Sequence, residues 1–259
     1  MEMTIYFNEK NFTLMHGDCL EILPKIEPGS ITTIFADPPY NLSNGGITCK
    51  AGRMVSVNKG DWDKSQGFEK DYQFTYNWIK ECHRVLKPNG TIWISGTMHN
   101  IYQVGYALQS LGFHIINEIV WYKPNAPPNL ACKCFAHSHE TLIWAKKGKA
   151  EKHHFNYSLM KEWMDKFSPS GRQMRSLWNI PLTPQNEKNN GKHPTQKPIE
   201  LLQRIISASS KKGDLILDPF NGSGTTGIVA RHLSRQYVGI DKEKEFLDLT
   251  IRRLKEFTE

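Results

Sequence analysis

Short apolar runs alternate with amphipathic stretches along most of this chain. Runs rich in β-branched residues and bounded by Pro, Gly or Asn predict buried strands over 12–15, 31–36, 91–95, 115–123, 140–146, 214–218 and 236–240. Helical periodicity predicts helices over 19–23, 69–86, 99–111 and 198–210, and a further helix that begins near Thr225. Strands that alternate with helices are typical of an α/β fold with a mostly parallel sheet and helices on both faces.

The strand at 31–36 ends in Asp37-Pro38-Pro39-Tyr40. Two prolines cannot continue a ladder, so the chain leaves the sheet in a stiff turn at the edge where α/β sheets bind ligands. The turn offers the Asp37 carboxylate, the Pro38 carbonyl and the Tyr40 ring. Two acceptors and a stacking face suit a flat group with an NH2, such as a nucleobase drawn out of its helix. An ordinary surface turn is the alternative, since Asp and Pro are common there.

A second motif begins at the strand 214–218, which ends in Asp218-Pro-Phe-Asn-Gly-Ser-Gly-Thr-Thr226. Its glycines allow backbone N–H groups to approach a ligand, and Asp241 follows about twenty residues on, where a ribose-binding acid is expected. The spacing of Gly222, Gly224 and Gly227 also permits a nicotinamide-binding site. Against that alternative, Asp218-Pro-Phe220 separates the strand from the glycines, and little chain is left for a substrate domain. A loop glycine used only for packing is the other alternative.

Composition and charge restrict the class of protein. The chain has 259 residues, 39% hydrophobic and 23% charged, and no apolar run of the ~20 residues needed to span a bilayer. The N-terminus lacks the layout of a signal peptide, and five scattered cysteines form no disulfide framework, so we expect a cytoplasmic protein. Residues 121–200 hold 13 Lys/Arg and 6 Asp/Glu, which accounts for the whole net charge of +7. This favours a face for a polyanion over a merely solvated lysine-rich surface.

Two segments lack clear periodicity. Residues 41–67 are rich in glycine, leave directly from the turn at Asp37 and are expected to close over a substrate. Solvated loop charges are the default interpretation of Lys50, Arg53 and Lys59, and contact with phosphates is the alternative. Residues 124–192 carry many prolines and the aromatic residues Trp163, Phe167 and Trp178 among basic ones, which suits a nucleic-acid backbone and its bases.

Two smaller motifs have structural alternatives. Cys132-x-Cys134 and His137-x-His139 are spaced unlike a structural zinc site, so we expect no metal. Lys192-His193-Pro-Thr195-Gln-Lys197-Pro198 precedes a helix and is also consistent with a simple helix start.

Together, the motifs at 37–40, 193–198 and 218–226 resemble the β-class S-adenosylmethionine-dependent DNA amino-methyltransferases. The order is also similar: the catalytic motif comes first, a variable recognition region lies in the middle and the cofactor loop comes last. Ser43-Asn-Gly-Gly46, Lys59-Gly-Asp-Trp-Asp63 and Ser95-Gly-Thr-Met-His-Asn-Ile101 resemble the small adenine methyltransferases of GATC-specific restriction systems. The resemblance covers nearly the whole chain and implies a Rossmann-like methyltransferase fold.

The family implies a division of the chain into a catalytic part (1–124), a target-recognition insertion (125–191) and a cofactor-binding part (192–259). Asp37, Pro38, Pro39 and Tyr40 would be catalytic. The loop with Asp218, Phe220, Gly222, Ser223, Gly224 and Thr225 would wrap S-adenosylmethionine, with Asp241 on its ribose and Asp18 near its adenosine or the target base. His193, Thr195 and Lys197 would hold its carboxylate end. DNA is the implied partner, and the resemblance also implies a homodimer and a cognate endonuclease.

The implied reaction follows from the electronics of an exocyclic amine, whose lone pair is delocalised into the ring. If Asp37 and the Pro38 carbonyl accept its two N–H bonds, the lone pair becomes available for in-line displacement, while Tyr40 stacks on the flipped base. Asp in the first motif position favours N6-adenine, and N4-cytosine poses the same chemistry. A non-catalytic nucleic-acid-binding module, and an RNA or protein amine as target, are the remaining alternatives.

Overall fold

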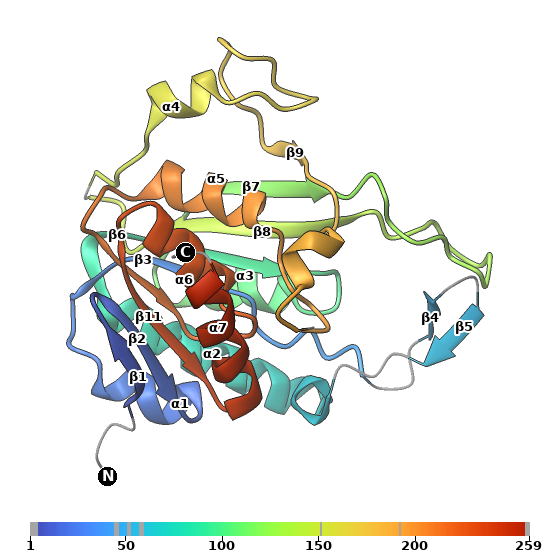
Figure 1. Cartoon of the computed structure of the whole chain (residues 1–259), viewed down its shortest axis with the longest axis horizontal. Coiled ribbons are helices and arrows are strands. Elements are labelled where there is room, and N and C mark those ends of the chain that lie inside the picture. Colours follow the sequence, from blue (N-terminus) through green and yellow to red (C-terminus); the bar gives the residue numbers. More distant parts are fainter. Residues whose placement is uncertain are drawn as a thin grey trace.

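The computed structural model describes residues 5–43, 47–50, 53–56, 60–150, 152–191 and 193–256. Nine strands of this part form one sheet, in the order β1-β2-β11-β10-β3-β6-β8-β7-β9 (Figure 1). They are β1 (Ile5–Glu9), β2 (Phe12–His16), β3 (Ile31–Ala36), β6 (Leu86–Gly96), β7 (His114–Tyr122), β8 (His139–Lys146), β9 (Leu177–Asn179), β10 (Leu215–Asp218) and β11 (Gln236–Asp241). The central strands β2, β11, β10, β3 and β6 pair in parallel, whereas β1 and β8 pair antiparallel with their neighbours.

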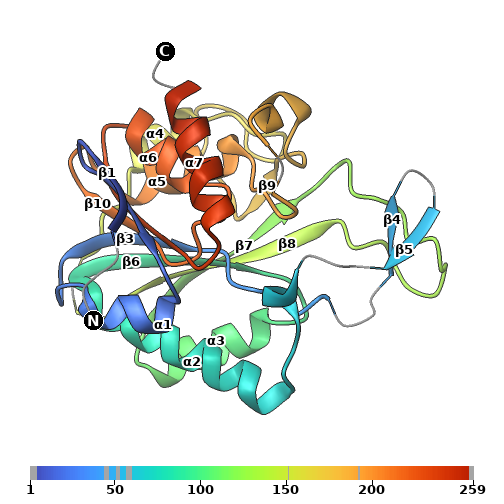
Figure 2. The ribbon, with the colours of Figure 1, turned by 60° about the horizontal axis from the view of Figure 1, so that its bottom comes forward.

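Helices cover both faces of the sheet, as the alternating pattern predicts (Figure 2). On one face lie α1 (Cys19–Ile22), α2 (Phe68–Val85) and α3 (Ile101–Ser110). On the other lie α4 (Tyr157–Glu162), α5 (Ile199–Ser209), α6 (Thr225–His232) and α7 (Lys244–Glu256). Each layer encloses its own apolar core, one around Trp78 and Ile79 of α2 and one around Leu201 and Ile205 of α5. The predicted α/β fold is therefore confirmed.

Most predicted elements are present, with ends shifted by a few residues. The sequence missed β1, α4, β9 and α7. It also treated 41–67 as irregular, but this segment contains the hairpin β4 (Ile47–Lys50) and β5 (Arg53–Ser56) and the 3₁₀ turn η2 (Asp61–Asp63). Residues 44–46 and 59 lie outside the described residues, as do the side chains of Lys50 and Arg53.

The range 125–191 is not one separate insertion. It includes β8, which pairs with both β6 and β7 inside the main sheet. Strand β8 lies between β6 and β7 and runs antiparallel to both. An antiparallel neighbour can follow its partner through a hairpin loop, which here is the loop 124–138 between β7 and β8. Two stretches of the range remain outside the sheet, the loop 124–138 between β7 and β8 and most of the segment from 147 to 191.

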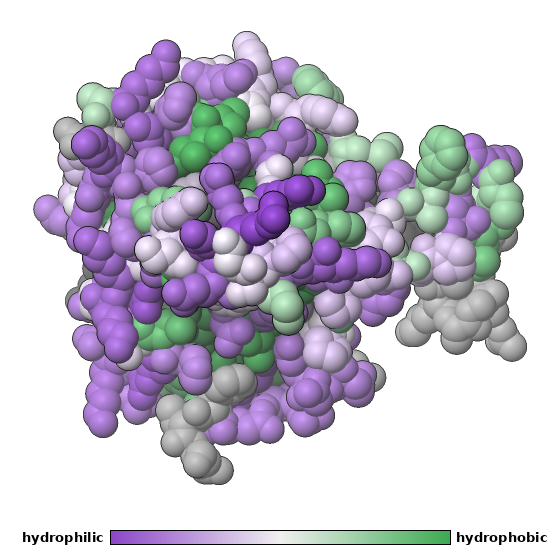
Figure 3. Space-filling model, turned by 90° about the horizontal axis from the view of Figure 1, so that it is seen from above, coloured by the Kyte–Doolittle hydropathy of each residue, from purple (hydrophilic) through white to green (hydrophobic). Residues whose placement is uncertain are grey.

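The loop 124–138 projects from the body beside the β4–β5 hairpin, on the side to which β7 points (Figures 1 and 2). Its surface includes Phe135, which is 95% exposed, and Leu130. Figure 3 shows that the projecting part carries hydrophobic as well as hydrophilic surface. An exposed aromatic ring on a projecting loop is typical of a surface that binds a partner.

A buried ion pair fastens the segment 157–179 to α5. Arg204 is fully buried, and its Nη1 donates to Asp165 Oδ2 at 2.7 Å. Asp165 also accepts from the backbone N–H groups of Phe167 and Asn179, and the guanidinium lies 5.0 Å from the ring centre of Trp178. Since this carboxylate holds both the guanidinium and two backbone amides, the segment depends on it for its fold.

We predict that Arg204→Met lowers the free energy of unfolding by about 3–5 kcal/mol, because it leaves Asp165 charged, buried and without its cation. The matched control is Arg231→Met, which removes a more exposed partner 3.6 Å from Glu9 and is expected to cost less than about 1 kcal/mol. Chemical denaturation of both variants measures the difference. Equal losses in the two variants would contradict the assigned role.

Candidate active site

Four aspartates meet at one edge of the sheet because four parallel strands end there. Asp37 follows β3, Asp218 ends β10, Asp241 ends β11 and Asp18 stands two residues after β2. All four line one cavity of about 440 Å³. That volume lies in the range of small-molecule sites. The cavity is also lined by other residues that the sequence singled out, namely Pro39, His193, Thr195, Lys197, Phe220, Gly222, Ser223 and Thr225.

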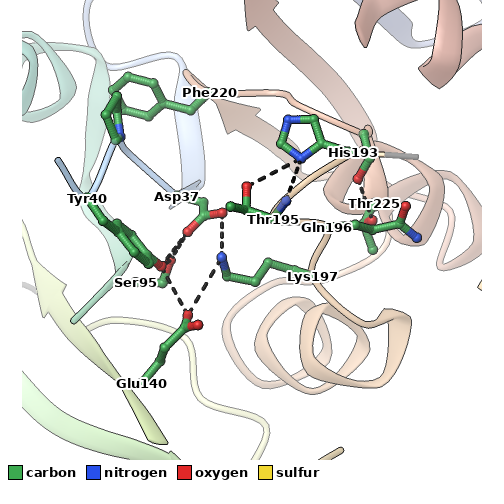
Figure 4. Close-up of polar contacts among 12 residues, drawn as sticks. Asp37, Tyr40, Ser95, Glu140, His193, Thr195, Gln196, Lys197, Phe220 and Thr225 are labelled. Carbon is green, nitrogen blue, oxygen red and sulfur yellow. Dashed lines mark hydrogen bonds and ion pairs between the residues drawn. The ribbon is translucent and has the colours of Figure 1, made fainter. Parts of the chain in front are cut away.

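The turn at 37–40 is held by hydrogen bonds at its side chains. Asp37 Oδ1 accepts from Ser95 Oγ at 2.5 Å and lies 2.6 Å from the Tyr40 hydroxyl (Figure 4). The same hydroxyl lies 2.9 Å from Ser95 Oγ and 3.1 Å from Glu140 Oε2. Burial, and then the charges of Asp37 and Glu140, raise the pKa of Tyr40 well above its usual value, so the phenol keeps its proton. Tyr40 is only 6% exposed, and its stacking on a base stays a prediction.

Lys197 contacts the turn at 37–40 through Asp37. Its Nζ donates to Asp37 Oδ2 at 2.5 Å and lies 3.6 Å from Glu140 Oε2 (Figure 4). Burial alone would lower the pKa of Lys197, but the two carboxylates more than offset this and raise it. The resemblance assigned Lys197 to the carboxylate end of a cofactor, whereas the structure pairs its charge with Asp37. Sequence separation hides this contact, since the two residues are 160 positions apart.

Glu140 and Lys123 extend the ion pair of Asp37 and Lys197 to four charged side chains. The sequence did not single out either of them for a site. Lys123 Nζ donates to Glu140 Oε1 at 3.0 Å. Burial by itself would raise the pKa of Glu140, but Lys197 and Lys123 outweigh it, so the pKa is lowered. The available signal was an acidic residue at the start of the apolar run 140–146, where a carboxylate needs a buried partner.

Asp63 fixes the backbone that follows Pro38 and Pro39. This carboxylate is 2% exposed, and its Oδ1 accepts from the N–H groups of Tyr40 and Asn41, both at 2.9 Å. Its Oδ2 accepts from Leu42 N at 3.1 Å and Ser43 Oγ at 2.9 Å. Asn41 has φ +59°, which turns successive N–H groups toward one anion. Asp63 is therefore the anchor of the turn, although the sequence pattern includes it only as part of a family motif.

The second half of the site is the loop after β10. Asp218 accepts from Thr226 Oγ1 at 2.6 Å and from Phe220 N at 3.0 Å. Asp241 accepts from Gly222 N at 2.7 Å and from Glu243 N at 2.9 Å. Burial raises the pKa of Asp218 to about 7 and that of Asp241 to about 6. Neither carboxylate has a cation beside it among these contacts, so both retain capacity for a positively charged or hydroxyl-bearing ligand.

His193 closes the cavity from the other side. Its ring lies nearly parallel to Trp62 at 6.2 Å between ring centres and edge-on to Phe246 at 4.3 Å. Thr195 N and its hydroxyl both lie 3.3 Å from His193 Nδ1. Gly222 has φ +50°, and a side-chain carbon there would meet the His193 ring at 3.3 Å. The glycine thus allows the loop after β10 and the histidine to approach each other.

The remaining predicted residues have structural contacts as well. Asp18 caps α1 by accepting from Leu20 N at 2.8 Å. Phe220 packs edge-on against Trp78 at 5.2 Å, with part of the ring on the cavity. Ser223 and Thr225 are buried beside Arg253, whose Nη1 donates to Ser223 O and Thr225 Oγ1. Pro38 is buried and lines a small hollow with Asp37 and Tyr40.

Among the residues that the structure describes, no cluster of His, Cys, Asp and Glu side chains is arranged to hold a metal ion. Asn129 Nδ2 lies 2.8 Å from Cys134 Sγ, within the loop 124–138. In the same part of the chain, no helix has the length and apolar character needed to cross a membrane.

The fold and this site define a DNA methylase. The family model with that description, which groups N6 and N4 methyltransferases, matches residues 31–252, and the chain belongs to this family. It is 54% identical to the type II methyltransferase M2.DpnII of Streptococcus pneumoniae over 250 residues, which is 96% of this chain and 91% of the relative. It is 48% identical to the type II methyltransferase M2.MboI of Moraxella bovis, over 100% of this chain and 93% of the relative.

Solved structures agree with this assignment. An M1.HpyAVI–SAM complex is 27% identical with a TM-score of 0.68, and the match covers 94% of this chain and 98% of the other. The cytosine-N4-specific PvuII DNA methyltransferase has a TM-score of 0.75 at 19% identity, over 99% of this chain and 93% of the other, and shows the shared fold. The resemblance to DNA amino-methyltransferases is therefore confirmed.

We predict that Asp63→Ala increases the local opening of the backbone at residues 40–42. Losing a buried carboxylate that holds Tyr40, Asn41 and Leu42 should lower the protection free energy of their amides by about 1–3 kcal/mol. Hydrogen exchange followed by mass spectrometry measures this. Asp71→Ala is the matched control, because Asp71 holds Ser65 Oγ and Gln66 N in the next turn and should leave the amides of 40–42 unchanged.

We predict a pH-dependent stability effect of Asp218→Asn. The pKa of Asp218 is raised from 3.8 to about 7 by burial, so the folded chain binds this proton more tightly than the unfolded chain. The stability from Asp218 is present below about pH 4 and lost as the pH rises through 7. Because Asn stays neutral, the variant should gain on the wild type between pH 5 and pH 8, by a few kcal/mol at most. Denaturant midpoints at each pH test it, and a constant difference would refute the shift.

Proposed function

We propose that this protein transfers a methyl group from S-adenosylmethionine to the N6 amine of adenine in DNA, within GATC. The observation that carries the proposal is the carboxylate of Asp37, held in a fixed turn at the edge of a cavity whose other wall is the loop 218–226. Similarity to type II methyltransferases supports the DNA substrate, and the motif resemblance to GATC-system adenine enzymes supports the base and the sequence.

The residues present fit S-adenosylmethionine. Asp241 retains acceptor capacity for ribose hydroxyls, and Asp218 is a buried carboxylate without a cation, which suits a positively charged ligand. Phe220 gives the cavity an apolar surface, while His193 and Thr195 remain for the carboxylate end, because Lys197 is engaged by Asp37. Asp18 lines the adenosine or target-base side. When bound, the cofactor supplies an electrophilic methyl group.

The chain's own residues activate the amine. Oδ1 of Asp37 is occupied by Ser95 and Tyr40, so Oδ2 is the oxygen that accepts one N–H of the target amine, beside Lys197. The Pro38 carbonyl accepts the other N–H. With both N–H groups held, the nitrogen lone pair leaves conjugation and is available to the methyl group that the bound cofactor would supply. The nitrogen then releases one proton, to Asp37 or directly to water. Tyr40 borders the base.

The basic loops outside the sheet are assigned to DNA. The segments 124–138 and 147–191 hold nine Lys/Arg and four Asp/Glu, which is five of the seven excess positive charges, and they include the exposed Phe135. We assign them to the target duplex. Similarity to type II methyltransferases supports pairing with a restriction endonuclease, and a DNA substrate supports a cytoplasmic location. A homodimer stays a prediction of the family resemblance.

Labelled S-adenosylmethionine and unmethylated genomic DNA, followed by nucleoside mass spectrometry, test the function. N6-methyladenine restricted to GATC is the expected product. N4-methylcytosine would preserve the fold and chemistry and overturn the base. No label in DNA would overturn the proposed function.

We predict that Asp37→Ala abolishes methyl transfer while binding of S-adenosylmethionine survives, because the Asp218 and Asp241 half of the site comes from other strands. Transfer is measured by the mass-spectrometric assay and binding by calorimetry. Loss of both would instead assign Asp37 a role in folding.

A further inference from the structure

Four charged side chains form one group at the turn 37–40, namely Asp37, Lys123, Glu140 and Lys197. Lys197 bridges Asp37 and Glu140, and Lys123 binds the other oxygen of Glu140 (Figure 4 shows the first three). Their side chains are 7%, 15%, 13% and 13% exposed for Lys197, Asp37, Glu140 and Lys123. At this burial, charges are poorly screened by solvent, so the sum of the group matters to any reaction beside it.

The group is neutral as it stands, with two ammonium and two carboxylate charges. The Tyr40 hydroxyl contacts Asp37 and Glu140 and contributes no charge. Without the Glu140 charge, the two lysines would face Asp37 alone, and the group would carry one net positive charge.

That excess would oppose the proposed reaction. An amine nitrogen that forms a bond to a methyl group develops positive charge until it loses its proton. A neutral group with a carboxylate directed at the nitrogen stabilises this charge, and a cationic group raises its energy.

We propose that Glu140 is a positioning residue for methyl transfer, one that keeps the charged group behind Asp37 neutral and divides Lys197 between two carboxylates. The inference rests on the proposed function. It assigns a role to a residue in β8, within the range that the sequence had given to target recognition.

Glu140 also connects the reaction centre to the projecting loop. Lys123 follows β7 at the first residue before loop 124–138, and Glu140 is the second residue of β8 on its far side. Lys123 N also donates to Ser138 O at 2.7 Å, which closes the base of the loop. The Lys123–Glu140 ion pair therefore links the base of the loop to the carboxylate that contacts Lys197.

The test compares Glu140→Gln with the double variant Glu140→Gln, Lys123→Met in single turnovers at saturating DNA and S-adenosylmethionine. Glu140→Gln keeps the shape but leaves a net positive charge, and the methyl-transfer rate should fall about tenfold to a hundredfold. The double variant is neutral again, so its rate should recover at least half of that loss on a logarithmic scale. Cofactor affinity should stay within about twofold in both variants.

A matched control is Asp214→Asn, which removes a carboxylate at the start of β10, at the opposite edge of the sheet. Its rate should equal that of the wild type. A wild-type rate in Glu140→Gln, or a further loss in the double variant, would overturn the proposal. A wild type that methylates no DNA would instead overturn the proposed function, so the two failures are distinguishable.

Discussion

Burying several carboxylates at one sheet edge costs free energy, and each carboxylate at this edge is stabilised in its own way. Asp37 has Lys197 and two hydroxyl groups. Asp63 has three backbone amides and a serine. Asp218 and Asp241 accept hydrogen bonds, but burial outweighs these bonds and raises the pKa of both carboxyl groups. The edge is therefore complete on the catalytic side and short of positive charge on the side proposed for a cationic cofactor.

The strand order explains how distant parts of the chain form one site. Strands β10 and β11 come late in the sequence but lie between β2 and β3 in the sheet. The turn at 37–40 after β3 thus stands directly beside the glycine loop after β10. Lys197, just before α5, reaches the turn from the same late part of the chain. The pairing of these strands in the sheet therefore brings groups from distant parts of the chain next to one another.

Features that depend on local pattern were predictable. An apolar run that ends in Asp37 or Asp218 predicts both a strand and the edge at which its carboxylate emerges, and the structure has both. Features that depend on tertiary pairing were not. The partner of Asp37 is 160 residues away, and β8 returns to the sheet antiparallel, which no periodicity encodes. Asp63 looked like part of an irregular glycine-rich stretch, because four donors converge on it only after the turn has folded.

Trp62 and Asp63 are adjacent in sequence, yet they contact different halves of the site. Trp62 lies against His193 at the cofactor side, and Asp63 holds the backbone of the catalytic turn. The two halves consequently share one conformational coordinate. A ligand that orders Trp62 reduces the entropy still to be lost when the catalytic turn receives its base, and linkage makes the effect reciprocal. In equilibrium terms, a ligand on the Trp62 side and a ligand on the Asp63 side would then bind with positive cooperativity without touching each other.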